Sequence, residues 1–434
     1  MSAKRVWWIS SAVVVAVAVG AAAATGVTVQ RTYADLQHGT PFAAVTPEPM
    51  LAAADAADPV DVQALADALA AAANDNKALA TFAGQVIDTS TGQVVWDRDG
   101  SKALTPASTT KVLTLSAALW TLGEDDVITT QIVRGVNDGE VVIKATGDVW
   151  MTAEQLDAAA EDIKKALGET APTAVFIDTS AWAGPEQAEG WDPENVDGGY
   201  VAPMQPAMLY GGRLGATTGD VVPRSHTPAL DVAQALADRL AVKTVGLSEA
   251  PANAAVVAEM TSPTLGERAE EMMKESDNVM AEAIAREVAA KVGAEVSFSG
   301  ATEAVRQVLA DHGVDLNGVT IHDGSGLSEG NRIPPAALAN LMNQAVTDET
   351  LRPLLADLPV AGGDGTLYTR YSDKSGRGWV RAKTGTLTGV SALAGTAQGN
   401  SGHLYAFGFL VNDAEDIDAA RAAEDQLASI LHDH

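Results

Sequence analysis

The sequence predicts a mixed α+β protein in which an α/β lobe is inserted into a main domain of sheet and helices, preceded by an apolar N-terminal helix. The main domain is indicated by apolar, β-branched segments at 82–88 and 93–96, which flank a glycine-containing turn. A strand pattern at 404–411 and an amphipathic helix at 419–431 end the chain. The lobe is indicated by alternating helix and strand patterns between about 124 and 261.

The alternation within this stretch is typical of an α/β layer structure. The strand patterns are Val127–Val133, Val141–Ala145, Ala174–Ile177 and Ala254–Ala258, and the helical patterns are Thr152–Leu167 and Ala229–Val242. We therefore expect a discontinuous main domain, formed by 59–123 and 262–434, around an inserted lobe at 124–261.

The N-terminal segment indicates export. Lys4 and Arg5 precede an uncharged run from Val6 to Val29, which is long enough to span a membrane. Small residues at 21–24 also suit cleavage by a signal peptidase, so 1–29 is either a signal peptide or an anchor. In both cases the two cations stay in the cytoplasm and the rest of the chain becomes extracytoplasmic.

Two further segments follow the apolar run. Residues 30–58 are rich in Ala, Asp, Thr and Pro and are predicted to be a linker. Asp58-Pro59 then predicts the start of a helix that continues through Ala73. Folded structure is expected from about this point.

Composition excludes several classes of function. Lys plus Arg number 28 and Asp plus Glu number 57, so the net charge of −29 repels nucleic acid. The chain has no cysteine, which excludes disulfides, thiolate metal sites and cysteine nucleophiles. Its seven histidines show no metal-ligand spacing, and we expect neither a metal nor a cofactor.

A candidate nucleophile lies at the start of a nearly uncharged helical pattern. Ser108 and Lys111 are spaced so that both side chains lie on one helix face. Burial would favour the neutral amine of Lys111, which could then take the proton of the Ser108 hydroxyl. Alone the motif is typical of an ordinary helix start, because a chain of this length contains about one Ser-x-x-Lys by chance.

Two more motifs follow in a fixed order. Ser276-Asp277-Asn278 comes far along the chain from Ser108, within a helical pattern from Leu265 to Val288. Lys383-Thr384-Gly385-Thr386 follows near the end of the chain, between strand patterns at 379–381 and 387–393. Each motif taken alone fits an ordinary polar turn or strand edge.

The ordered set resembles the serine penicillin-recognising enzymes, namely penicillin-binding proteins and serine β-lactamases. Segments that narrow the resemblance to class C low-molecular-mass penicillin-binding proteins are His322–Ser328, Leu358–Gly362, Lys383–Val390, Gly190–Pro193 and Gly199–Pro203. The likeness runs from about Leu79 to Asn412. It implies a transpeptidase-like domain with a central antiparallel sheet flanked by helices, and D-alanyl-D-alanine carboxypeptidase activity, in many members with endopeptidase activity.

The resemblance also implies roles in acyl transfer. Ser108 would attack the D-Ala-D-Ala bond of a peptidoglycan stem peptide and form an acyl-enzyme, with Lys111 as base. Ser276 and Lys383 would relay a proton to the leaving amine. Asn278 would hold the substrate amide and Lys111. β-Lactams would acylate the same serine as covalent inhibitors.

The remaining implied roles concern substrate binding. The hydroxyls of Thr384 and Thr386, on either side of Gly385, would bind the terminal carboxylate together with the Lys383 cation. The backbone N–H groups of Ser108 and Thr386 would stabilise the oxyanion. Because the whole motif set lies outside 124–261, we expect the lobe to carry no catalytic group.

Two positions depart from the family pattern. Glu329 stands where a basic residue is usual, and Val149 where proline is common. The Glu329 departure affects the fine substrate preference that the resemblance implies.

Other polar and aromatic residues have structural interpretations. Ser325 is expected in a tight turn below the site and Asp277 is expected to order its own turn. Asp148 is expected in a solvated turn, with binding of a substrate cation as the alternative. Trp182 and Trp191 are expected to pack within the lobe rather than stack on glycan rings.

Two other functions share parts of this pattern. A serine β-lactamase needs rapid deacylation, usually with a Glu-x-x-Leu-Asn segment, and the chain contains none. A protein that binds muropeptides or penicillin without turnover is the second alternative. The intact Ser108, Lys111 and Lys383 argue against it.

Overall fold

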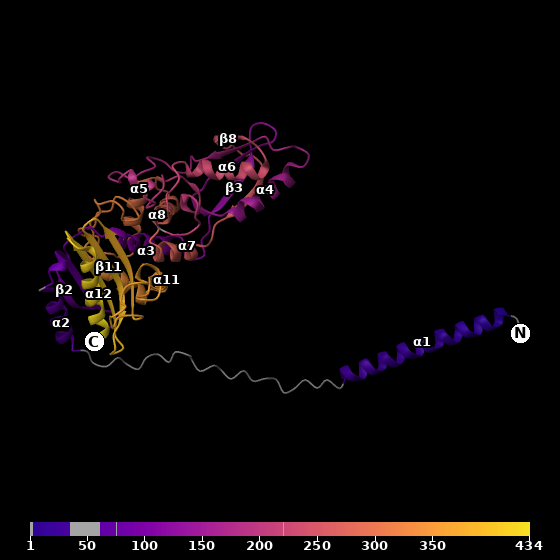
Figure 1. The fold of residues 1–434 in the computed structure, drawn as a ribbon, viewed down its shortest axis with the longest axis horizontal. Coiled ribbons are helices and arrows are strands. Elements are labelled where there is room, and N and C mark those ends of the chain that lie inside the picture. The colour runs from indigo at the N-terminus through magenta and orange to yellow at the C-terminus, as the bar shows by residue number, and fades with distance from the viewer. Residues whose placement is uncertain (1–2, 35–60, 75, 220) are drawn as a thin grey trace. The chain divides into compact units, whose positions relative to one another are not determined.

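A computed structural model describes residues 3–34, 61–74, 76–219 and 221–434 (Figure 1). Contacts divide the chain into two units, Met1–Asp55 and Ala56–His434. In the first unit, helix α1 spans Ala3–Ala34. Its segment Ala12–Arg31 is long and apolar enough to cross a membrane, and the described side chains of this helix are exposed.

The predicted boundary at Gln30 is wrong, because Gln30 to Ala34 continue α1. The rest of the predicted linker lies outside the described residues, as does the helix start predicted at Asp58-Pro59. The helix itself is present as α2, Val62–Asn74.

An antiparallel sheet forms the centre of the second unit and joins the two ends of its chain. Its strand order is β10-β11-β12-β1-β2. Strand β1 pairs along its whole length with β12, in a register that joins Thr81 to Asn412 and Asp88 to Tyr405. The strands are β1 Thr81–Asp88, β2 Gln93–Arg98, β10 Val380–Leu387, β11 Val390–Gln398 and β12 Leu404–Asn412. The hairpin and the C-terminal strand predicted from the sequence are both present.

Helices cover both faces of this sheet. On one face, α12 and α2 enclose a core that includes Leu69, Phe407 and Leu427. The other face packs against α10 and a second, larger core. The helical elements of this domain are η1 Lys77–Leu79, η2 Ala107–Thr110, α3 Lys111–Thr121, α7 Leu265–Lys274, α8 Asn278–Val292, α9 Phe298–Asp311, α10 Pro335–Thr347, α11 Arg352–Asp357, η4 Gly365–Leu367 and α12 Ile417–Asp433.

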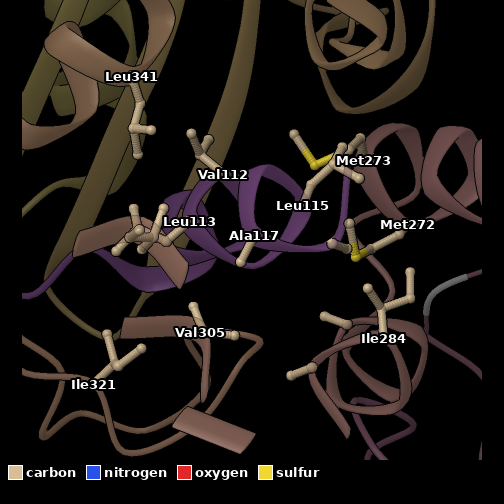
Figure 2. Packing of buried hydrophobic residues seen from close by; sticks show 14 of the residues in the cluster. Val112, Leu113, Leu115, Ala117, Met272, Met273, Ile284, Val305, Ile321 and Leu341 are labelled. Carbon is tan, nitrogen blue, oxygen red and sulfur yellow. The ribbon is translucent and has the colours of Figure 1, made fainter. Parts of the chain in front are cut away.

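Helix α3 lies at the centre of the larger core, and nearly all of its side chains are buried. Figure 2 shows Val112, Leu113 and Leu115 of α3 surrounded by side chains from other elements. This explains the absence of charge between Val112 and Leu119, because a helix contacted on all sides buries every face. The N-terminus of α3 is thereby fixed against the central sheet.

A second sheet lies within 129–261, at the end of the unit away from the central sheet (Figure 1). Its order is β8-β6-β4-β3-β9, with β4, β6 and β8 parallel and the remaining pairs antiparallel. Helices α4 and α6 pack on this sheet and on each other. The elements of this region are β3 Thr129–Arg134, β4 Glu140–Lys144, β5 Asp148–Met151, α4 Ala153–Leu167, β6 Ala174–Asp178, α5 Glu194–Asp197, β7 Ala207–Leu209, η3 Tyr210–Gly212, α6 Pro228–Leu240, β8 Thr244–Leu247 and β9 Val256–Thr261.

Three local expectations are wrong. The continuous helix predicted from Leu265 to Val288 is broken into α7 and α8 by the turn at 275–277. The Lys383 motif lies inside the long strand β10 rather than between two short strands. Asp148 is buried in β5, paired with β7, and therefore lies in neither a solvated turn nor an open substrate site.

Candidate active site

Ser108 lies in the 3₁₀ turn η2, directly before α3 and beside strand β10. Two glycines permit this close packing. A Cβ on Gly385 would lie 2.6 Å from the carbonyl oxygen of Pro106, and one on Gly326 would lie 1.9 Å from that of Ala107. Gly385 therefore allows β10 to approach the Ser108 turn, which gives a steric reason for the glycine in the Lys-Thr-Gly motif.

The Lys111 amine is fully buried and has three polar neighbours. Its Nζ lies 3.0 Å from Ser108 Oγ, 2.6 Å from Asn278 Oδ1 and 2.7 Å from the carbonyl oxygen of Ser325. Burial lowers the pKa of Lys111 to about 8, against the opposing effect of Asp323 and two other carboxylates. The serine and a readily deprotonated amine are thus within hydrogen-bonding distance.

Lys383 and Ser276 form a second pair. Lys383 Nζ donates to Ser276 Oγ at 2.8 Å and to the carbonyl oxygen of Thr384 at 3.0 Å. The Lys383 side chain is fully buried, and burial together with the nearby charge of Lys111 holds its pKa well below the usual value. Ser276 has φ of 61°, in the left-handed region that non-glycine residues seldom occupy.

Asp277 fixes the turn that carries Ser276 and Asn278. One carboxylate oxygen accepts the backbone N–H of Met280 and caps α8, in agreement with its predicted structural role. The other accepts from Arg213 at 2.6 Å and Arg224 at 3.4 Å. Burial acts to raise the pKa of Asp277, but the two guanidinium groups hold it below its ordinary value.

The inserted region takes part in shaping the site. Arg213 and Arg224 come from it, and Asn278 Nδ2 donates to the carbonyl oxygen of Tyr200 at 2.9 Å. These contributions were not predicted from the sequence. Gly199–Pro203 resembles the family insertion, but a backbone carbonyl has no side-chain signature, and the two arginines stand in no motif.

The turn at 323–328 forms the floor of the site, as predicted for Ser325. Asp323 accepts the backbone N–H groups of Gly326 and Ser328, and its other donors include Trp191 Nε1 at 2.8 Å. Glu282 accepts the backbone N–H of Ser325 at 2.8 Å, and burial raises the pKa of this carboxyl to about 7. The floor is therefore held by two buried carboxyls, Asp323 within the turn and Glu282 of α8.

The two tryptophans pack, as predicted, and their partners include helices outside 124–261. Trp191 lies edge-on to Phe298 of α9, with ring centroids 5.1 Å apart. Trp182 lies under the guanidinium of Arg286 of α8, at 5.0 Å. Both rings fasten the inserted region to the helices behind the site.

An open cleft of about 940 Å³ brings the predicted residues together. Ser108, Ser276, Asn278, Thr384 and Thr386 line it, while Lys111, Lys383 and Gly385 lie buried behind its wall.

The strand side of the cleft has its own polar contacts. Thr384 Oγ1 donates to Thr366 Oγ1 at 2.7 Å, and Thr386 Oγ1 accepts from Arg421 of α12 at 3.0 Å. Of the two departures from the family pattern, Glu329 lines the cleft and Val149 is buried in the larger core. Among the described residues, no group of three or more His, Asp or Glu side chains is arranged to hold a metal ion.

A serine hydroxyl next to a buried lysine amine, in an open cleft beside an antiparallel strand, defines the class of serine hydrolases that work by acyl transfer. The chain belongs to the D-Ala-D-Ala carboxypeptidase 3 (S13) family, whose sequence model matches residues 65–223 and 216–434. It is therefore a serine-type D-Ala-D-Ala carboxypeptidase, of a family of cell-wall enzymes.

Individual relatives agree with this assignment. The chain is 41% identical to carboxypeptidase DacB of Mycolicibacterium smegmatis, over 97% of this chain and 94% of the relative. It is 27% identical to a D-alanyl-D-alanine carboxypeptidase of Actinomadura sp., over 80% of each chain. The crystal structure of penicillin-binding protein 4 from Haemophilus influenzae has the same fold, with a TM-score of 0.70 at 23% identity, over 86% of this chain and 98% of that one.

Proposed function

We propose that this carboxypeptidase acts on peptidoglycan stem peptides ending in D-Ala-D-Ala through an acyl-enzyme on Ser108, and that β-lactams acylate the same residue. The observation that carries the proposal is the contact of Lys111 Nζ with both Ser108 Oγ and Asn278 Oδ1. It supplies a nucleophile, its base and a group that orients the base.

The first half of the reaction uses Lys111 as base. Ser108 Oγ attacks the carbonyl carbon between the two D-alanines and gives its proton to Lys111 Nζ. The backbone N–H groups of Ser108 and Thr386 stabilise the oxyanion of the tetrahedral intermediate. Asn278 holds Lys111 and the peptide amide.

The second half releases D-alanine and then the acyl group. As the C–N bond breaks, the leaving amine takes a proton from Ser276 and Ser276 takes one from Lys383, while the proton that Lys111 received from Ser108 passes on to Lys383, so neither amine gains or loses a proton over the cycle. The 2.8 Å contact of Lys383 with Ser276, and the low pKa of the Lys383 amine, support this relay more than the alternative role of a fixed cation for the carboxylate. Water then hydrolyses the ester on Ser108 and restores the hydroxyl.

The same proposal covers location and domain organisation. The apolar helix α1, with Lys4 and Arg5 at its start, supports export through a signal peptide or an uncleaved membrane anchor. We also propose the division into a catalytic domain of 59–123 and 262–434 and a lobe of 124–261. The separate sheet within 129–261 supports this division.

Release of D-alanine from a peptide ending in D-Ala-D-Ala tests the catalytic proposal. Wild-type protein should release one D-alanine per peptide, and Ser108→Ala should release none above background. Ser116→Ala is a matched control that should keep its activity, because this buried serine of α3 donates to the carbonyl oxygen of Val112 and does not line the cleft. Full activity in Ser108→Ala would contradict the assignment.

A further inference from the structure

The substrate of the proposed reaction ends in a carboxylate, and the negative charge in and around the cleft opposes the binding of that carboxylate. The chain has a net charge of −29, and Asp192, Glu275, Glu329 and Asp418 are among the residues that line the cleft. An anion held beside several carboxylates needs a cation at short range. Lys383, the cation expected from the motif, is fully buried and does not line the cleft.

In the described part of the chain, the cations that line the cleft are Arg224, Arg370 and Arg421. Arg224 is buried and paired with Asp277. Arg370 Nε donates to both carboxylate oxygens of Asp425. A terminal nitrogen of Arg370 donates to one of these oxygens at 2.6 Å. Buried carboxylates therefore already neutralise these two cations.

Arg421 differs from the other two cations. One terminal nitrogen of Arg421 lies 3.1 Å from a carboxylate oxygen of Asp418. The Arg421 side chain is 37% exposed and the Asp418 side chain is 90% exposed. Solvent screens an ion pair of this kind, so a ligand carboxylate can compete with Asp418 for the guanidinium. The second terminal nitrogen of Arg421 lies 3.0 Å from Thr386 Oγ1, on the strand beside Ser108.

The helix under Arg421 is firmly placed. Arg370 donates to the carbonyl oxygen of Arg421 at 3.1 Å and holds Asp425 one turn further along α12. Strand β10 is placed by the packing of Gly385 against Pro106 and Ala107. The guanidinium and the Thr386 hydroxyl thus form a prepared pair of donors on one wall of the cleft.

We propose that Arg421, acting with the Thr386 hydroxyl, binds the C-terminal carboxylate of the peptide and makes the enzyme selective for a free C-terminal acid. This inference rests on the proposed function and adds a specificity residue from a helix outside the three motifs. A planar guanidinium suits the task, because its fork of N–H donors matches a carboxylate.

The test compares an N-acylated D-Ala-D-Ala peptide with its C-terminal amide, on wild type and Arg421→Gln. Loss of a charge-assisted hydrogen bond predicts that kcat/KM on the acid falls by about 10- to 100-fold in the variant. The amide should change by less than about threefold, because it carries no charge for Arg421 to bind. Arg421→Lys keeps a positive charge but loses the planar, forked set of N–H donors, so its kcat/KM on the acid should lie between those of wild type and Arg421→Gln.

Arg352→Gln is the matched control, since it removes one exposed cation from α11, outside the residues that line the cleft. It should leave both substrates unaffected. An equal loss on acid and amide in Arg421→Gln, or no loss on the acid, would overturn the proposal.

A binding measurement separates this proposal from the catalytic one. In a Ser108→Ala background, calorimetry should show weaker binding of the acid, by a similar 10- to 100-fold, when Arg421→Gln is added. A wild-type protein that turns over no peptide, with Arg421-dependent binding intact, would contradict the proposed reaction and still support Arg421 as the carboxylate site. Binding of the acid that is unchanged by Arg421→Gln would overturn the present inference.

Discussion

At the scale of single residues, the burial of Lys111 determines how the reaction should depend on pH. The pKa of this amine is lowered to about 8, so the neutral base becomes the major form only above that pH. The rate of acylation by penicillin should therefore rise about tenfold per pH unit well below 8 and level off above it. Stopped-flow measurement between pH 6 and 10 checks this.

A matched variant identifies the titrating group. Glu329→Gln changes a charge within the cleft but not at Lys111, so it should leave the inflection near pH 8 in place. An acylation rate that is flat between pH 6 and 9 would show that the neutral Lys111 amine is not the base.

Some site residues could be predicted from sequence and others could not. Ser108 and Lys111 are found from their spacing, since a helical start places both on one face. Arg421 has no such signal, because an arginine in an amphipathic helix is usually solvated. Its contact with Thr386 depends on how α12 packs beside β10, which no local pattern encodes.

At the scale of elements, the turn between α7 and α8 is the part that depends most on distant residues. Apolar periodicity continues from Leu265 to Val288, so the sequence predicts one helix. Asp277 interrupts it by capping α8 and by pairing with Arg213 and Arg224. The left-handed backbone of Ser276 follows from that interruption, and it points to a functional turn.

Substitution of Asp277 should therefore affect both stability and catalysis. Asp277→Asn can still cap α8, but it leaves two buried guanidinium groups without their carboxylate. Breaking a buried pair costs about 3–5 kcal/mol, so thermal unfolding should occur several degrees lower. Acylation by penicillin should slow by at least about tenfold, because Ser276 and Asn278 lose their fixed positions.

Asp192→Asn is the control for this prediction, because Asp192 is exposed, lines the same cleft and carries the same charge. It should alter neither quantity appreciably. Wild-type stability in Asp277→Asn would mean that the inserted region does not hold the turn through these arginines.

At the scale of the whole molecule, buried carboxyls should make the protein more stable at mildly acidic pH. Burial raises the pKa of Asp148 to about 6, of Asp357 and Glu282 to about 7, and of Glu424 to about 8. Above about pH 4.5 the unfolded chain has lost these protons while the folded protein keeps them. The free energy of unfolding should therefore fall as pH rises from about 5 to 8.

Chemical unfolding at pH 5.5, 6.5 and 7.5 measures this trend, and Glu424→Gln is the informative variant. Glu424 loses its proton last, so the variant should lower the slope by up to about 1.4 kcal/mol per pH unit throughout this range, and above about pH 7, where the other three carboxyls have lost their protons, these carboxyls should contribute little remaining slope. Lys111 changes the folding balance only above about pH 8, whereas Lys383, whose pKa is held well below its usual value, loses its proton earlier in the folded protein and opposes part of this fall. A stability that rises with pH over this range would contradict the prediction.

Individual helices and strands could be predicted from the sequence better than the way they pair and pack. Strand and helix patterns predict β1, β12 and α12 within a few residues, whereas α9, α10 and α11 were not predicted. The pairing of β1 with β12, which lie at opposite ends of the folded chain, is not encoded by any local pattern. Nor is the contribution of Tyr200, Arg213 and Arg224 to the site, because they act through a backbone carbonyl and two guanidinium groups rather than through a motif.

Intact-mass measurement of the protein after incubation with a penicillin tests most directly whether Ser108 forms the acyl-enzyme. We expect a single, slowly lost adduct with the mass of one penicillin, located by peptide mapping on Ser108 and absent from Ser108→Ala. Rapid loss of the adduct would instead favour a β-lactamase. No adduct on wild type, or an adduct that persists in Ser108→Ala, would contradict the central claim.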